Sequence, residues 1–566
     1  MRVRTWLAGP VVAASVAAAS VSDSLGDGIT PSLEVARRRG PEIFNAVHNS
    51  MRQWGSSLHH NGMSSFIATV PKGVLLHHGN TSPNSPTQPD WLAYEIEHAE
   101  NFAHSRRGGP PGRGGRGPPP PQGDDREGEK QRTMKESHGT LELRGEEHKH
   151  AEEEEEEEER HGYLHVYETT RPLKFLYVDG MGGGKTTMGT LDWQDYLLRG
   201  KTPANDTDTW AHPQRDEPPP PPKRKGPGGG GPMDEQERAK DLCALCKEWG
   251  LQGVIRMEAG FEIIKCDFSD GLEQVQALQR PEDTDRRPGG FGNLEFVRGL
   301  SERYQGIGST RTIIDYSSMV SAFFFPVNMT NPDPKRQDLP RLVSVEQTQL
   351  AEIKKYLEGV VLERRDEEAR IIDWQDVSDL IVGRYADRLK DMAEAVDSIE
   401  TMANKVNFLL TLFVDGSNVE TTEDAIDRCA NFYLRSVRPA TQSDHLIHTA
   451  FKTVTHEICS TLFRVRNIVV TDPAPGRSSL AAAQSAVGAL MQSLSWTRFK
   501  RCPPCPINEV CVIPMWPMGT VEEYNNPRCS NGSEAEGGER YWGGGPGGPR
   551  GPGNGRDGGP PPPLFS

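Results

Sequence analysis

Apolar residues recur at helical spacing through the second half of the chain. From residue 385 to 413 they alternate in steps of four and three: Tyr385, Leu389, Met392, Val396, Ile399, Ala403, Val406, Leu410 and Phe413. This pattern predicts one continuous helix with an apolar seam, and a second stripe at 444–466 supplies a partner. We interpret the seam as the core of a helical domain over 341–500, with helix-mediated self-association as the alternative.

Polar residues mark where these helices begin. Ser344 with Gln347 has the spacing of a capping box, and Asp373 is placed to cap the helix that carries the seam. We therefore expect one helix to start near Ser344 and the next at Asp373.

The first half alternates short helical and strand patterns. Apolar residues at 43–54 have helical spacing, whereas 73–77 and 172–178 are short apolar runs typical of buried strands. A helix at 234–249 ends at Gly250, and 253–258 with 261–268 resemble a hairpin. The chain thus predicts an α+β fold, with an N-terminal mixed domain built from 31–104, 161–202 and 233–330.

Three stretches are too polar or too rich in glycine and proline to bury a core. They are 105–160, 203–232 and the tail 531–566, and we expect all three to be disordered. Arginines and glycines near residue 110 would suggest RNA binding in a nuclear protein, but behind a signal peptide a solvated linker is the simpler interpretation. The net charge of −16, eight charges of which lie in the run Glu152–Glu159, argues against nucleic acid as a partner.

The N-terminus has the features of a secretory signal. Arg2 and Arg4 precede an apolar stretch and the small residues 17–19, which predicts a signal peptide over 1–22. No segment predicts a transmembrane helix. Four N-x-S/T sequons are candidate glycosylation sites, namely Asn80, Asn205, Asn328 and Asn531. We therefore expect a secreted protein or one of the secretory-pathway lumen, with wall-bound and vacuolar destinations left open.

Nine cysteines agree with an oxidising compartment. The disulfide candidates are Cys243, Cys246, Cys266, Cys429, Cys459, Cys502, Cys505, Cys511 and Cys529. The odd number leaves at least one free or intermolecular, and Cys266 is a candidate partner for one of the first two. The segment 501–530 is expected to be held by two disulfides, with zinc as the alternative, and their connectivity stays open. We predict no metal site.

Other motifs have ordinary interpretations. Gly180–Thr186 follows a strand and resembles a phosphate-binding loop, but Asp179 stands where that pattern requires glycine. The pair Cys243 and Cys246 lies two turns into its helix, away from the N-terminal position that a redox pair needs. His445, His448 and His456 lack partners at ligand spacing and are expected to be ordinary surface or core residues.

The order of elements from 74 to 268 resembles ADP-ribosyltransferase-like folds. The resemblance rests on His78–Gly79 at a strand end, an aromatic at Tyr94 and a late-strand carboxylate at Glu262. It implies NAD as cofactor, with His78 and Gly79 at the nicotinamide nucleotide, Tyr94 on the ring and Glu262 stabilising a ribosyl cation. Asn80 stands where that family usually has threonine.

A second resemblance covers most of the ordered chain. The segments at 77–79, 91–93, 176–181, 255–262 and 315–320, with the terminal cysteines, resemble uncharacterised secreted proteins of filamentous fungi. That group implies a compartment and no activity, so whether the chain is an enzyme stays open. We expect a secreted or cell-surface protein with a binding or structural role, and an ADP-ribosyltransferase-like enzyme is the alternative.

Overall fold

The computed structural model describes residues 28–103, 161–201, 235–281, 294–300, 311–367, 372–415, 421–471, 476–531 and 541–542. The predicted signal peptide, both predicted insertions, Asn205 and most of the C-terminal tail lie outside these residues. All nine cysteines and the other three sequons lie within them.

A mixed nine-stranded sheet forms the centre of the N-terminal half, which confirms the predicted α+β class. Its strand order is β8-β4-β2-β3-β7-β6-β5-β1-β9, and β5 with β6 is the parallel pair among antiparallel neighbours. The strands are β1 (Ser64–Val70), β2 (Leu75–Asn80), β3 (Asp90–Ala93), β4 (Tyr163–Thr169), β5 (Leu173–Val178), β6 (Gly253–Met257), β7 (Phe261–Lys265), β8 (Leu272–Gln279) and β9 (Ile313–Ser321).

Local sequence explains the elements next to the site. Every residue of β6 and β7 is buried, as expected for the apolar run on each side of the Ala259–Gly260 turn. Helix α5 (Glu235–Trp249) ends where Gly250 takes a φ of 72°, a left-handed conformation that glycine adopts without steric cost. The predicted hairpin and the predicted helix are both present.

Shorter helices surround the sheet. They are α1 (Leu33–Arg38), α2 (Gly40–Asn49), α3 (Gln53–Leu58), α4 (Ile96–Glu100), the π-helix η1 (Trp193–Leu198) and α6 (Leu294–Arg298). Helix α8 (Gln347–Arg364) packs on β9 and on η1. Its N-cap is Glu346, which forms the capping box with Gln349, so the predicted box of Ser344 and Gln347 is wrong by two residues. The Val345 N–H donates to Leu342 in a turn, and this turn delays the helix start.

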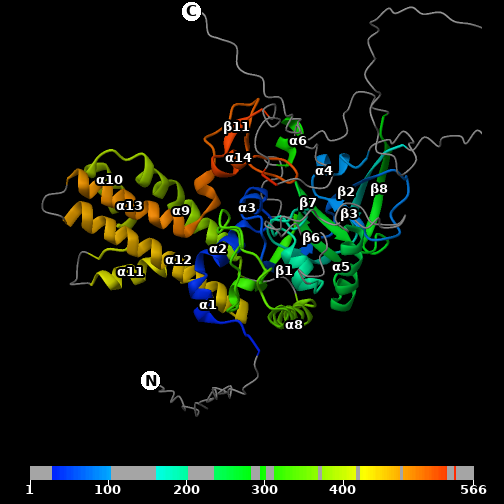
Figure 1. The fold of residues 1–566 in the computed structure, drawn as a ribbon, viewed down its shortest axis with the longest axis horizontal. Coiled ribbons are helices and arrows are strands. Elements are labelled where there is room, and N and C mark those ends of the chain that lie inside the picture. Colours follow the sequence, from blue (N-terminus) through cyan, green and yellow to red (C-terminus); the bar gives the residue numbers. More distant parts are fainter. Residues whose placement is uncertain are drawn as a thin grey trace, which may run out of the picture.

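Most of the remaining helices form a bundle beside the sheet (Figure 1). They are α9 (Trp374–Glu394), α10 (Ile399–Leu410), α11 (Thr422–Ala430), α12 (Gln442–Arg466) and α13 (Arg477–Leu494). Asp373 caps α9 as predicted, through its side chain to the Asp376 N–H. The seam is divided between two helices, because Ala395 ends α9 and the Ser398 hydroxyl caps α10. The single continuous helix predicted for this stretch is therefore wrong.

The seam lies inside the bundle. Seven of its nine residues are buried, where α9 packs on α13 and α10 packs on α12. The N-terminal helices α1 and α2 also pack on α12, and Figure 1 shows them between the sheet and the bundle. One apolar cluster consequently runs from the sheet into the bundle. None of the described helices is both long and apolar enough to cross a membrane.

Eight of the nine cysteines form four disulfide pairs. They are Cys243–Cys266, Cys429–Cys459, Cys502–Cys511 and Cys505–Cys529, with Cα–Cα distances of 5.4, 6.0, 5.8 and 5.5 Å. Cys246 is free and buried. The last two pairs join a segment made of β10 (Val510–Val512), α14 (Val521–Asn525) and β11 (Arg528–Ser530).

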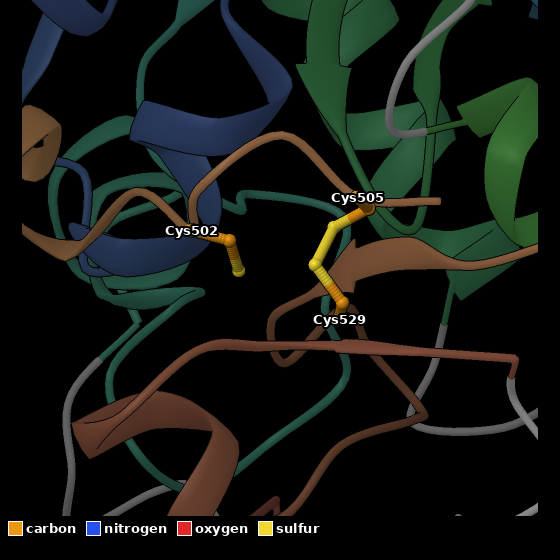
Figure 2. Close-up of side chains that lie close together, drawn as sticks. All are labelled: Cys502, Cys505 and Cys529. Atoms are coloured by element: carbon orange, nitrogen blue, oxygen red, sulfur yellow. A yellow bond between two sulfur atoms is a disulfide. The ribbon is translucent and has the colours of Figure 1, made fainter. Parts of the chain in front are cut away.

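Three of the C-terminal sulfurs lie within 4.8 Å of one another, from Cys502, Cys505 and Cys529. Figure 2 shows the Cys505–Cys529 bond beside Cys502. Because all three sulfurs are bonded to other sulfurs, none is a thiolate available to zinc. This arrangement is the two-disulfide one expected from the sequence.

Candidate functional site

A cavity of about 390 Å³ lies where β2, β3 and β7 run side by side. Its walls are largely apolar and include three large aromatic side chains, Trp91 from β3, Phe102 after α4 and Trp516 from the disulfide-held segment. Its ionisable residues are Glu235, Glu258, Glu262, Lys185, Asp90 and three histidines, His77, His78 and His98. A cavity with apolar walls and a few converging polar groups is the usual form of a small-molecule site.

The glycine-rich loop after β5 brings Lys185 into this cavity. Gly183 donates its N–H to Met257 O, which fastens the loop to the end of β6. A Cβ on Gly183 would lie 2.9 Å from Met257 O and 3.0 Å from Glu262 Oε1, so only glycine fits at this approach. Lys185 Nζ then lies 2.7 Å from Glu258 Oε2. The loop that resembles a phosphate cradle therefore delivers an ammonium group to a carboxylate.

A fully buried arginine holds two of the glutamates. The Nε of Arg256 donates to Glu262 Oε1 at 2.7 Å, Nη1 donates to Gln194 Oε1 at 3.1 Å, and Nη2 donates to Glu235. Because an unpaired charge in the interior is very costly, this arginine requires its carboxylates. The side chain of Glu262 is consequently fixed at the cavity wall rather than free to rotate.

The electrostatic surroundings give the glutamates of the cavity different pKa values. Burial raises the pKa of Glu258 to about 7, against the opposing effect of Lys185. Burial also disfavours the charge on Glu235, but Arg256 and Lys185 outweigh it and lower the pKa of Glu235 to about 2. Carboxylates whose pKa values are driven apart in one cavity are a common basis for acid–base chemistry. Glu258 is thus able to exchange a proton near neutral pH.

Helix α4 places His98 against the same carboxylates. His98 is 4 % exposed, and its Nδ1 has no hydrogen-bond partner among the described residues. Burial lowers the pKa of His98 to about 4, so the imidazole is neutral at physiological pH. Its ligand nitrogen and one carboxylate oxygen each of Glu258 and Glu262 all lie within 4.8 Å of one another. One imidazole with two carboxylates is a donor set that suits a divalent transition metal.

Glu95 fixes the turn of the β6–β7 hairpin. Both of its carboxyl oxygens accept from the Phe261 N–H, at 3.1 and 3.0 Å. A Cβ on Gly260 would lie 2.7 Å from His98 Nδ1 and 2.8 Å from Glu95 Oε2, so this glycine permits the close approach of α4. Burial raises the pKa of Glu95 to about 8.

The disulfide-held segment covers one side of the cavity. Val510, Ile513 and Met515 pack with Ala259, which lies in the β6–β7 turn. Trp516 donates its backbone N–H to Met181 Sδ at 3.4 Å, and its ring centroid lies 4.9 Å from Lys185 Nζ. A segment more than 240 residues away from the β6–β7 hairpin in sequence therefore completes the wall of the cavity.

The structure brings together some of the residues that the ADP-ribosyltransferase resemblance singles out. His78, Gly79 and Glu262 line the cavity. Tyr94 does not line it: the residue is fully buried, and its hydroxyl bonds Thr312 at 2.6 Å. His78 Nδ1 lies 2.7 Å from Trp91 O, and His78 Nε2 is 3.9 Å from Asp90. A ring on a ligand in this cavity would meet Trp91 or Phe102 rather than Tyr94.

Five residues of the site were not predicted from the sequence: Lys185, Arg256, Glu258, His98 and Trp516. One signal was available, since two glutamates and an arginine fall within the apolar run 253–264, where charges are rare unless they are paired. Lys185 belongs to the loop that resembles a phosphate-binding motif, and Trp516 lies in the cysteine segment, where no pattern distinguishes it. Nothing local marks His98, because its role depends on the position of α4.

The described sequons differ in exposure. Asn328 and Asn531 are exposed, whereas Asn80 is half-buried and its Oδ1 lies 3.0 Å from His165 Nε2. Of the helix-α12 histidines, His445 and His456 are exposed and His448 is half-buried beside Trp374. Burial raises the pKa of the Cys246 thiol to about 12, which leaves it unreactive.

Comparisons with known proteins show that the chain is similar to uncharacterised fungal proteins. Residues 34–286 match a family model described as the YPL277C N-terminal domain. The uncharacterized protein YOR389W of Saccharomyces cerevisiae is 26 % identical over 567 aligned positions, which cover 85 % of this chain and 82 % of the relative. The uncharacterized protein YPL277C of the same yeast is 31 % identical over 246 positions, 42 % of each chain. No solved structure matches. These matches support the expected similarity to uncharacterised fungal proteins.

Proposed function

We propose that this chain is an exported protein that binds a small, ring-containing, polar ligand in the cavity between β2, β3, β7 and the disulfide-held segment. The observation that supports this proposal is the combination of aromatic side chains in the cavity wall with the buried pair Glu258 and Glu262. Aromatic faces stack on flat or ring-shaped ligands, and carboxylates accept hydrogen bonds from hydroxyl groups. Sugars and nucleosides present both features.

Export is supported by three features. Residues 2–21 have the charge and hydrophobicity of a secretory signal. Four disulfide pairs within the described residues suit an oxidising compartment, because thiols are kept reduced in the cytosol. The exposed sequons Asn328 and Asn531 agree with passage through the secretory pathway.

A second candidate function is transfer or hydrolysis at the ribosyl carbon of NAD. The observation that favours it is the presence of His78 and Glu262 on one cavity. A carboxylate held at a fixed place next to a developing oxocarbenium ion stabilises the transition state electrostatically. Arg256 fixes Glu262 for such a role, and Glu258 is able to supply or accept the proton.

The full chain, secreted with its disulfides intact and treated with EDTA, is titrated with monosaccharides, nucleosides and NAD by calorimetry. We expect one of these classes to bind, and Trp516→Ala to weaken that binding about tenfold, since it removes one stacking surface. Phe432→Ala, at an exposed aromatic of the helical bundle, is the matched control and leaves affinity unchanged. Absence of binding by every class, or equal affinity of both variants, contradicts the proposal.

The NAD candidate is separated by its product. Release of nicotinamide from NAD is followed for the wild type, for Glu262→Gln and for Glu248→Gln, an exposed glutamate on α5. Turnover that is lost only in Glu262→Gln supports the enzyme. No release from the wild type excludes it and leaves the binding proposal to its own titration.

A further inference from the structure

Three donor groups converge on one side of the cavity from separate parts of the chain. His98 comes from α4, Glu258 from the β6–β7 turn and Glu262 from β7, and they are 4, 8 and 3 % exposed. Their ligand atoms lie within 4.8 Å of one another. Ligand atoms about 2.0–2.2 Å from a shared ion lie roughly 3–4 Å apart, so a contraction of about 1 Å would close the site.

The imidazole of His98 supplies the nitrogen donor of this group. The side chain lines the cavity and is 4 % exposed. Its Nδ1 is buried beside Gly260, without a hydrogen-bond partner among the residues described. A neutral imidazole carries its proton on one nitrogen and has a free lone pair on the other, which is the form that binds metal ions.

The two carboxylates are already oriented by a second layer of groups. Arg256 Nε holds Glu262 Oε1 at 2.7 Å, and Lys185 Nζ holds Glu258 Oε2 at 2.7 Å. Each glutamate retains a second oxygen that these bonds do not use. Such outer contacts fix the direction of a ligand in metal sites and affect its affinity for the ion.

We propose that His98, Glu258 and Glu262 form a binding site for one divalent transition-metal ion, Zn²⁺ or Mn²⁺, at the cavity wall. One nitrogen and two oxygen donors suit these ions, whereas Ca²⁺ and Mg²⁺ are usually bound by oxygens alone. Three protein ligands leave at least one coordination position directed to the cavity, as in catalytic rather than structural sites. The inference goes beyond the proposed function, because it names an ion that the bound ligand would meet.

Lys185 has a specific part in this site. Its ammonium lies 2.7 Å from Glu258 Oε2 and already compensates the carboxylate charge that a divalent ion would neutralise. An ion bound to Glu258 would lie close to this ammonium, and the two cations would repel each other. Lys185 Nζ also lies 4.9 Å from the centroid of the Trp516 ring, which gives the ammonium a second favourable contact that does not involve Glu258. Replacing Lys185 with methionine is therefore expected to tighten metal binding.

The test uses the full chain with its disulfides intact, stripped with EDTA and freed of chelator. Mn²⁺ binding is measured by the loss of the free-ion EPR signal, and Zn²⁺ binding by calorimetry, both without organic ligand. We expect one ion per chain, at least about a hundredfold weaker binding in His98→Ala, and tighter binding in Lys185→Met. His456→Ala, an exposed histidine of α12, binds as the wild type does.

Glu258→Gln is a second variant that keeps the shape of the side chain and an oxygen for Lys185. It also loses affinity, and circular dichroism shows that each variant is folded. No stoichiometric binding of either ion overturns the proposal, as does undiminished binding by folded His98→Ala and Glu258→Gln. The ligand titration is carried out in EDTA, so failure of the metal site and failure of the ligand site are separate results.

Discussion

At the scale of single residues, the site depends on glycines that allow backbone and carboxylates to meet. Gly183 lies against Met257 and Glu262, and Gly260 lies against His98 and Glu95. A side chain at either position would separate groups that now lie in contact. The glycines of the loop after β5 therefore allow this loop to lie close to the β6–β7 hairpin. Their role is this close approach and not phosphate binding.

Gly183→Ala tests this role. The added methyl would lie 2.9 Å from Met257 O and from Glu258 Cβ, so the loop has to move and carry Lys185 away from its partner. We expect a loss of about 1–3 kcal/mol in the free energy of unfolding, measured by urea denaturation. Ligand and metal affinities change with it, because the 2.7 Å pair with Glu258 is disturbed.

Gly359→Ala is the matched control. This glycine lies in the middle of α8 with no atom within 4 Å of an added Cβ. Alanine has the higher helix propensity, so stability is expected to rise by up to about 1 kcal/mol. Equal destabilisation by both substitutions would show that the contacts of Gly183 do not matter.

At the scale of elements, the C-terminal disulfide segment acts as a wall of the cavity. Cys502–Cys511 and Cys505–Cys529 hold a segment whose apolar residues pack on the β6–β7 turn. The segment contains little regular structure of its own, since β10 and β11 have three residues each. Its position next to Lys185 consequently depends on the crosslinks.

Removing the Cys505–Cys529 bond with a double alanine variant should loosen Trp516. We expect a loss of ligand affinity of roughly tenfold, together with a loss of stability of up to about 3 kcal/mol. The control is the double alanine variant at Cys429 and Cys459, which join α11 to α12 away from the cavity. It should lose comparable stability and keep its ligand affinity. Calorimetry measures the ligand affinity of the two double variants, and urea denaturation measures their stability. Equal losses of affinity would contradict the role of the C-terminal segment as a wall of the cavity.

At the scale of the whole molecule, N-terminal helices join the sheet to the helical bundle. Asn45 on α2 donates to Leu494 O at 2.9 Å, and Trp54 on α3 donates its indole N–H to Thr497 O at 3.1 Å. Arg52 forms hydrogen bonds to both carboxylate oxygens of Asp379 on α9. Segments more than 300 residues apart thus share one apolar interior, and we expect sheet and bundle to unfold together.

Buried carboxyl groups make this joint stability depend on pH. The pKa of Glu95 is raised to about 8 and that of Asp179 to about 7, chiefly by burial in both cases. The native state therefore keeps protons that the unfolded chain has released, and stability falls as pH rises towards these values. Neutral buried histidines act in the opposite direction below about pH 6.5: the pKa of His59 and of His98 is lowered to about 4, again chiefly by burial.

Between pH 6.5 and 8 the carboxyl groups dominate. We expect the free energy of unfolding to fall by about 1.4 kcal/mol per pH unit for each proton retained. Glu95→Gln keeps a carbonyl oxygen for the Phe261 N–H and carries no proton to lose, so its stability should vary less over this range. Urea denaturation at pH 6.5 and pH 8 measures the difference. A slope equal to that of the wild type would show that Glu95 is not responsible.

Local patterns predicted the elements that local forces specify. The helix that ends at Gly250 and the hairpin around Gly260 are both where periodicity and turn residues place them. The division of the seam at Ser398 was missed, because a heptad-like pattern continues unchanged across the break. Of the candidate site, Glu262 and His78 were identified through a resemblance, whereas Lys185 and Trp516 were not.

By itself the sequence determined local elements such as the helix that ends at Gly250 and the hairpin around Gly260, and it contained the charges within an apolar run that must find partners. Both follow from neighbouring residues, through side-chain periodicity and the cost of burying charge. Only the tertiary structure decided which charges meet. Strands β3 and β7 are adjacent in the sheet but far apart in the chain, and α4, the glycine loop and the C-terminal segment reach them from three separate places. Convergence over such separations depends on the packing of the whole sheet, which no local pattern encodes.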